Sequence, residues 1–232
     1  MTADSVHPGL AQRYYRAFLS LAYVGDSRPT YAITLRSMSA QAVRMGHHRP
    51  AQHLADSAIR AAGRSAPPPV LAYLHVQRAL THAHNQQRQA AVSDLARAHR
   101  HHERGSGQPG PFTAYPLAGL EFQSARTLLA LGDSTKRLTV LRDSVAHRDA
   151  GRRRATALTR AALAETLLGL GHLEEACAHW NVFLDQTPHL GSAQVDRALT
   201  RLRASLRPYR HHQHAALLWR RVRAISTSSQ PT

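Results

Sequence analysis

Apolar residues recur every three or four positions along most of the chain, the spacing that places side chains on one face of an α-helix. In residues 9–24, Leu10, Tyr14 and Leu21 follow this spacing, and Gly25 ends the run. Glycine, proline and short polar clusters separate such runs throughout. The pattern predicts helices at residues 9–24, 30–45, 49–62, 70–84, 88–102, 117–131, 135–148, 153–170, 173–186, 191–206 and 209–225.

The helices are expected to form pairs, because small residues recur at fixed distances from four turn residues. These turn anchors are Gly46, Gln86, Gly132 and Gly171, spaced 40, 46 and 39 residues apart. Two antiparallel helices can approach closely only where small side chains meet. Small residues lie seven positions before the anchors (Ser39, Ala79, Ala125, Ala164), five after (Ala51, Ala91, Ala176) and twelve after (Ala58, Ala98, Ser144), with Arg137 and Phe183 as departures.

This arrangement resembles the tetratricopeptide-repeat (TPR) pattern over roughly residues 30–205. The best copy is RAALAETLLGLGHLEEACAHWNVFLDQTP, in which Gly171 is the turn residue, Trp180 the aromatic nine positions later and Pro188 the closing proline. The anchor spacing exceeds the usual repeat of about 34 residues, which implies longer helices or loops.

Within the TPR family, the segments RSMSAQAVRMGHHRPAQHLADSAIRAA and GHLEEACAHW are similar to a divergent group. That group is the C-terminal sensor domain of helix-turn-helix transcriptional regulators of high-GC Gram-positive bacteria, where the repeats sense a peptide or protein. Residues 1–30 are too short for a helix-turn-helix, so the resemblance implies the sensor domain without it.

We therefore expect an all-α fold, a TPR-like right-handed α-solenoid of antiparallel helix pairs with about eleven helices. It should form a single domain over residues 9–225 with a long loop at 105–116, a flexible N-terminus at 1–8 and a disordered tail at 226–232.

The TPR register places positions of each first helix on the concave surface of such a solenoid. These positions predict a mixed groove in which amides hold the backbone of an extended peptide and arginines hold its carboxylates. An alternative for several of these residues is packing between helices. The candidate groove residues are Arg36, Tyr73, Gln77, Phe122, Gln123, Arg126 and Glu165.

The charge balance adds a second candidate site. The chain has 30 Lys and Arg against 14 Asp and Glu, a net charge of +16 that would attract nucleic acid or acidic proteins. Codon bias in a high-GC genome and the polar outer face of a terminal capping helix are alternative explanations. The candidate anion or nucleic-acid patch comprises Arg201, Arg203, Arg207, Arg210, Arg220, Arg221 and Arg223.

Candidate catalytic chemistry centres on GHLEEACAHWNVFLDQTPHLG at residues 171–191, which holds the single cysteine. On a helix, Glu175 and His179 share a face, whereas Cys177 points away from both, so these groups do not converge on one metal ion. We expect Cys177 to be a buried packing residue. Because phosphate-binding glycine loops, nucleophile elbows and HExxH motifs are absent from the sequence, we expect no enzyme activity, metal or cofactor.

One cysteine, no signal-peptide pattern and no apolar run of about 20 residues predict a cytoplasmic protein outside the membrane. The expected function is a regulatory binding module in transcriptional or signalling control, with a peptide or protein as partner. Nucleic-acid binding is the alternative, and a homodimer stays open.

Overall fold

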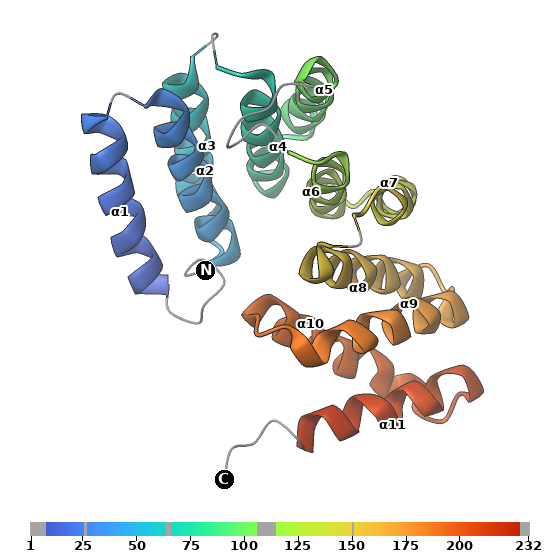
Figure 1. The fold of residues 1–232 in the computed structure, drawn as a ribbon. Coiled ribbons are helices and arrows are strands. Elements are labelled where there is room, and N and C mark those ends of the chain that lie inside the picture. The colour runs from blue at the N-terminus through green and yellow to red at the C-terminus, as the bar shows by residue number, and fades with distance from the viewer. Residues whose placement is uncertain (1–7, 26, 64–65, 106–114, 150, 228–232) are drawn as a thin grey trace. The chain divides into compact units, whose positions relative to one another are not determined.

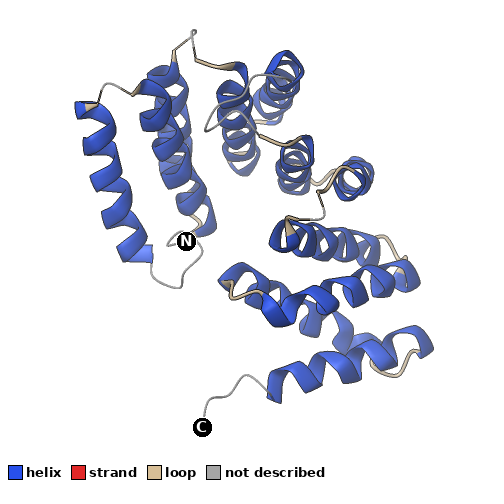
Figure 2. Ribbon diagram, in the orientation of Figure 1, coloured by secondary structure: helices blue, strands red, loops and turns tan. Residues whose placement is uncertain are grey.

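In the computed structural model, residues 8–25, 27–63, 66–105, 115–149 and 151–227 are described. They form eleven α-helices and two short 3-10 helices, with no strand among them (Figures 1 and 2). The predicted all-α fold of antiparallel helix pairs is confirmed. The elements are α1 (Pro8–Val24), α2 (Arg28–Arg44), α3 (His48–Ala62), α4 (Pro68–His84), α5 (Arg88–Gly105), α6 (Leu117–Ala130), α7 (Ser134–Ala146), α8 (Arg153–Gly169), α9 (Leu173–Gln186), η2 (Thr187–His189), α10 (Ala193–Leu206), η3 (Arg207–Tyr209) and α11 (Gln213–Thr227).

Contacts between backbone positions divide the chain into two compact units, Met1–Arg137 and Leu138–Thr232. The prediction of a single domain over residues 9–225 stays a prediction. The predicted loop at 105–116 and the predicted flexible N-terminus fall mostly outside the described residues. Helix α11 continues to Thr227, two residues into the tail predicted at 226–232, and the rest of that tail lies outside the described residues.

The four predicted anchors all form the same left-handed turn. Their φ angles are 80° at Gly46, 61° at Gln86, 75° at Gly132 and 88° at Gly171. After each anchor, the next N–H donates to the carbonyl oxygen five residues back, which satisfies a carbonyl at the end of the first helix. These four bonds are His47 to Ala42, Gln87 to His82, Asp133 to Leu128 and His172 to Leu167, each 2.9 Å long.

The small residues lie buried where the paired helices cross. In the α2/α3 pair, the Ser39 hydroxyl donates to the Ala51 carbonyl oxygen at 2.8 Å, which joins the position seven before the anchor to the position five after it. In α9, Trp180 and Phe183 are 1% and 0% exposed. Close approach at the small residues and bulky filling beside them therefore hold the α2/α3 and α8/α9 pairs together.

Two predicted helix starts in the second unit are wrong by a few residues. The helix predicted at 191–206 begins at Ala193, because Ser192 has extended backbone as its N-cap. The helix predicted at 209–225 begins at Gln213. Before it, Arg207–Tyr209 forms the 3-10 helix η3 around Pro208, which has no N–H to donate. No helix among the described residues is both long and apolar enough to cross a membrane.

Candidate functional site

The first helices of successive pairs in the first unit lie next to one another, since α4 packs against both α2 and α6. Arg36 comes from α2 and Tyr73 from α4. The guanidinium carbon of Arg36 lies 3.8 Å from the centroid of the Tyr73 ring, a cation–π contact. Arg36 is only 7% exposed, and its buried Nε has no hydrogen-bond partner. The site therefore contains a buried cation with an unused donor.

Arg126 of α6 adds a second positive charge to this region. Its Nη1 donates to the Gln123 side-chain oxygen at 3.0 Å. Partial burial, followed by repulsion from Arg36 and Arg44, lowers the pKa of Arg126 to about 10. The positive charges thus destabilise one another, and an anionic group placed among them would relieve that repulsion.

Tyrosine side chains surround the arginines. Tyr73 meets Tyr115 edge-on, with ring centroids 5.0 Å apart. Burial raises the pKa of Tyr15 on α1. The charges of Arg44 and Arg36 lower this pKa and Tyr73 raises it, so Tyr15 lies close enough to all three to belong to the same neighbourhood. We call Tyr15, Arg36, Tyr73, Gln123 and Arg126 the arginine–tyrosine face.

A stacked histidine pair adjoins this face. The rings of His48 and His84 are 4.5 Å apart and nearly parallel. Burial, then the neighbouring His48 and Arg126, lowers the pKa of His84. The Nδ1 of His48 is buried and has no hydrogen-bond partner. Sequence reasoning missed Tyr15 and these histidines. Tyr15 lies on α1, before the first helix pair, and the histidines lie at helix ends outside the register positions used for the groove.

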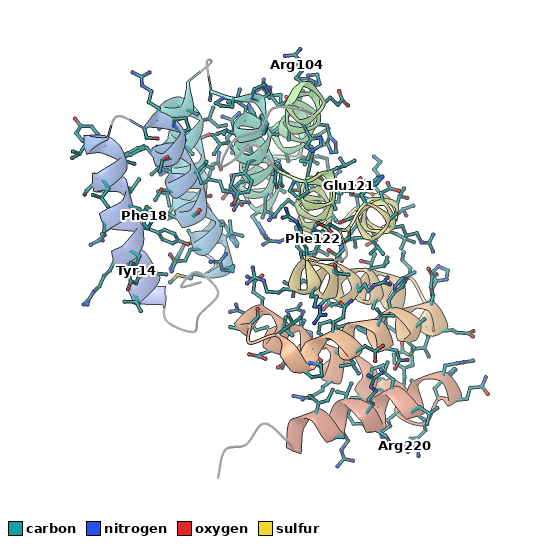
Figure 3. All side chains as sticks on the ribbon, in the orientation of Figure 1. Tyr14, Phe18, Arg104, Glu121, Phe122 and Arg220 are labelled. Carbon is teal, nitrogen blue, oxygen red and sulfur yellow. The ribbon has the colours of Figure 1, made fainter. Side chains whose placement is uncertain are left out.

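The other predicted groove residues have different surroundings. Gln77 is 0% exposed and donates to the Ser39 hydroxyl at 3.2 Å. It therefore packs between helices, which was the alternative to a place in the groove. Phe122 is partly exposed on α6 (Figure 3). Glu165 belongs to the second unit, where its Oε1 accepts from the Arg201 Nε at 2.8 Å. The first unit therefore brings together Arg36, Tyr73, Gln123 and Arg126 from the predicted set of seven.

The candidate arginine patch lies on α10, η3, α11 and, at Arg210, the turn between η3 and α11 of the second unit, where Figure 3 labels Arg220. Arg201 pairs with Glu165, and Arg221 pairs with Asp185. Arg203 is partly buried. The exposed members of the patch without an ion pair to a described carboxylate are Arg207, Arg210, Arg220 and Arg223.

Cys177 is buried, at 4% exposure, and burial raises the pKa of its thiol, which confirms its prediction as a packing residue. Its polar neighbours in sequence have partners of their own. Glu175 accepts from Arg142 at 2.8 Å, and the His179 Nδ1 lies 3.2 Å from the Arg160 Nη1. Across the described part of the chain, no group of three or more His, Cys, Asp or Glu residues could hold a metal ion.

Comparison with known proteins identifies the fold and leaves the family open. The chain matches no protein-family model and no curated protein. Its structure is similar to the crystal structure of BtubC (BKLC) from P. vanneervenii, with a TM-score of 0.64 and 14% identity. The match covers 97% of this chain and 93% of that chain. The fold is that of a TPR-like helical protein. At this identity the similarity concerns the fold alone, and the link to helix-turn-helix regulators stays a prediction.

Proposed function

We propose that the chain is a regulatory binding module that captures a peptide or partner protein on its arginine–tyrosine face, in transcriptional or signalling control. The observation that carries this proposal is the Arg36 guanidinium, buried against Tyr73 with an unused Nε donor. A TPR-like fold supports the proposal, since stacked helix pairs present broad surfaces to other chains. No catalytic step is part of this role.

The chemistry of the face favours a ligand that carries carboxylates. Arginine binds carboxylates through charge-assisted hydrogen bonds, which are stronger than neutral ones. Gln123 can bond a peptide backbone, and the tyrosine rings provide flat apolar surface. An acidic side chain or a C-terminal carboxylate near Arg126 would also offset the repulsion from Arg36 and Arg44.

Peptide selection followed by titration tests the proposal. A random peptide library should yield binders enriched in Asp and Glu. The affinity of the selected, labelled peptides is then measured by fluorescence anisotropy. Arg126→Gln should weaken their binding by about tenfold or more, because a charge-assisted bond is lost. The matched control is Arg220→Gln, an exposed arginine on α11 that should leave binding unchanged.

Thermal unfolding of the same variants separates binding from folding. Arg126→Gln removes a repelled charge, so the variant should melt at or above the wild-type temperature. Selected peptides that bind Arg126→Gln as tightly as the wild type, and lose affinity for Arg220→Gln, would contradict the proposal.

A second candidate function is nucleic-acid binding, favoured by the exposed Arg207, Arg210, Arg220 and Arg223 of the second unit. Binding through phosphate contacts falls steeply with salt. A gel-shift titration of duplex DNA and RNA at about 50 and about 200 mM salt would show a strong salt dependence. Arg220→Glu with Arg223→Glu should abolish the shift, whereas no shift at the lower salt removes this candidate.

A further inference from the structure

Apolar side chains cover about half of the circumference of helix α1. Towards α2, Ala11 and Ala22 are 3% and 6% exposed, and Leu19 packs against the core. The adjoining part of the same apolar face stays open to solvent. We call the open set the α1 stripe: Leu10, Tyr14, Phe18 and Leu21, which are 44%, 48%, 55% and 69% exposed.

The α1 stripe is a continuous row. At about 100° per residue, its members fall within an arc of about 80° on the helix. Tyr14 and Phe18 lie one turn apart on the same side of α1 (Figure 3). A surface helix ordinarily has one apolar face, and a contiguous exposed apolar patch marks an interaction site.

The position of α1 in the helix order explains why this row is uncovered. Helices α2 and α3 form one pair around the turn at Gly46, and α4 and α5 form the next around Gln86. Helix α1 precedes the first such turn and packs on α2. It is therefore a helix outside the pairs, and the exposure of its outer side shows that no described element covers it.

A surface hollow lies at the C-terminal end of α1, and Ala22, which follows Leu21 of the stripe, is one of its lining residues. Its volume is about 750 Å³, and Tyr23 and Val24 on its rim are 80% and 84% exposed. Arg28 of α2 and Arg60 of α3 give it positive charge. The lining residues are Ala22, Tyr23, Val24, Arg28, Tyr31, Arg60 and Ala61.

The charges around the α1 stripe select its occupant. Arg13 is exposed beside the row, about 60° from Leu10 around the helix, whereas Arg16 lies on the far side of α1, and residues 8–25 contain no Asp or Glu. A second copy of the chain would bring another net charge of +16 and place like charges side by side. An acidic helix would instead meet opposite charge at Arg13 and at Arg28 and Arg60 of the hollow.

We infer that the α1 stripe and the adjoining hollow bind one acidic amphipathic helix of a partner protein. The helix lies along α1 and completes a helix pair, with its apolar face on Tyr14 and Phe18. Its carboxylates contact Arg13 beside the row and the two arginines of the hollow. This surface does not depend on the arginine–tyrosine face.

Synthetic helical peptides test the inference. The probe is a labelled 18-residue peptide with leucines on one face and glutamates on the other, titrated by fluorescence anisotropy. Phe18→Ser with Leu21→Ser should weaken its binding by about tenfold or more, because central apolar anchors dominate such interfaces. The matched control is Leu217→Ser on α11, whose wild-type side chain is also 69% exposed, and it should leave binding unchanged.

Two further measurements keep the test specific. A peptide of the same composition without an apolar face should bind at least about tenfold more weakly, which separates docking from general attraction to a basic protein. Equal binding of both peptides, or unchanged binding to the double variant, would overturn the inference. Sedimentation that shows a dimer of the wild type and a monomer of the double variant would also overturn the inference, because the occupant would then be a second copy of the chain. Arg126→Gln should leave this binding intact, which distinguishes it from the proposed function.

Discussion

Of the four turn anchors, Gln86 alone is not glycine, yet its φ of 61° matches the others. A left-handed backbone costs a side-chain-bearing residue about 1–2 kcal/mol, and glycine adopts it freely. Three glycines could be predicted as anchors from residue type, whereas Gln86 could be placed only through the small residues at fixed distances on either side. The small residues on either side of an anchor thus determine the turn as much as the anchor residue itself does.

Replacing Gln86 by glycine should therefore stabilise the first unit. The free energy of unfolding should rise by about 0.5–1 kcal/mol, because strain is removed while some chain entropy is added to the unfolded state. Urea unfolding followed by circular dichroism measures the change. Gln89→Gly, in the first turn of α5, is the control and should lower stability by about 1 kcal/mol. A destabilised Gln86→Gly variant would contradict this explanation of the turn.

At the scale of helices, the spacing of small residues predicted the fold, but it predicted only part of the candidate site. Small residues at fixed offsets predicted which helices pair, because that geometry depends on backbone approach alone. The Arg36–Tyr73 contact joins α2 to α4, and the register predicted only that both face the same way. Gln77 has the same register as Gln123 but is buried, because Ser39 lies within reach of its amide. Exposure depends on neighbouring helices, which the repeat pattern does not specify.

The α4/α5 pair contains a buried ionic cluster that should matter for stability. Asp94 of α5 is 2% exposed and accepts from the Arg78 Nε at 2.6 Å, with the His75 Nδ1 at 3.0 Å. Burial raises the pKa of Asp94, but hydrogen bonds from His75 and Arg78 outweigh this and lower it to about 2. Asp94→Asn should cost about 3 kcal/mol of unfolding free energy, since Arg78 loses its charged partner.

Urea unfolding checks this prediction as well. Asp185→Asn is the control, because its pair with Arg221 is exposed and should contribute little. Equal small losses for both variants would show that the α4/α5 cluster is no more important than a surface ion pair.

For the whole molecule, partly buried histidines link stability to pH. Burial is the largest cause of a lowered pKa at four of them, which are His84, His99, His101 and His179. Below a pH of about 6.5 the unfolded chain protonates these rings more readily than the folded chain does. Their contribution to stability is therefore complete above that pH and is lost as the pH falls through the lowered folded-state values.

We accordingly expect the free energy of unfolding to fall between about pH 7.5 and pH 5.5, measured by urea titration at each pH. His84→Gln should reduce this dependence, because it removes one of the four groups. The carboxylate of Asp94 contributes nothing to the slope in that range, since its pKa is about 2. Stability that stays level or rises over this range would contradict the prediction.

The most direct measurement of the binding role is photocrosslinking of a library-selected peptide. Benzoylphenylalanine placed at Phe122, a partly exposed position on α6 next to Gln123, reports contact with the arginine–tyrosine face. The same probe placed at Leu217 on α11 reports contact with the second unit. We predict crosslinks at Phe122 that Arg126→Gln diminishes, and none at Leu217. Crosslinks at Leu217 alone would contradict a binding role for the arginine–tyrosine face.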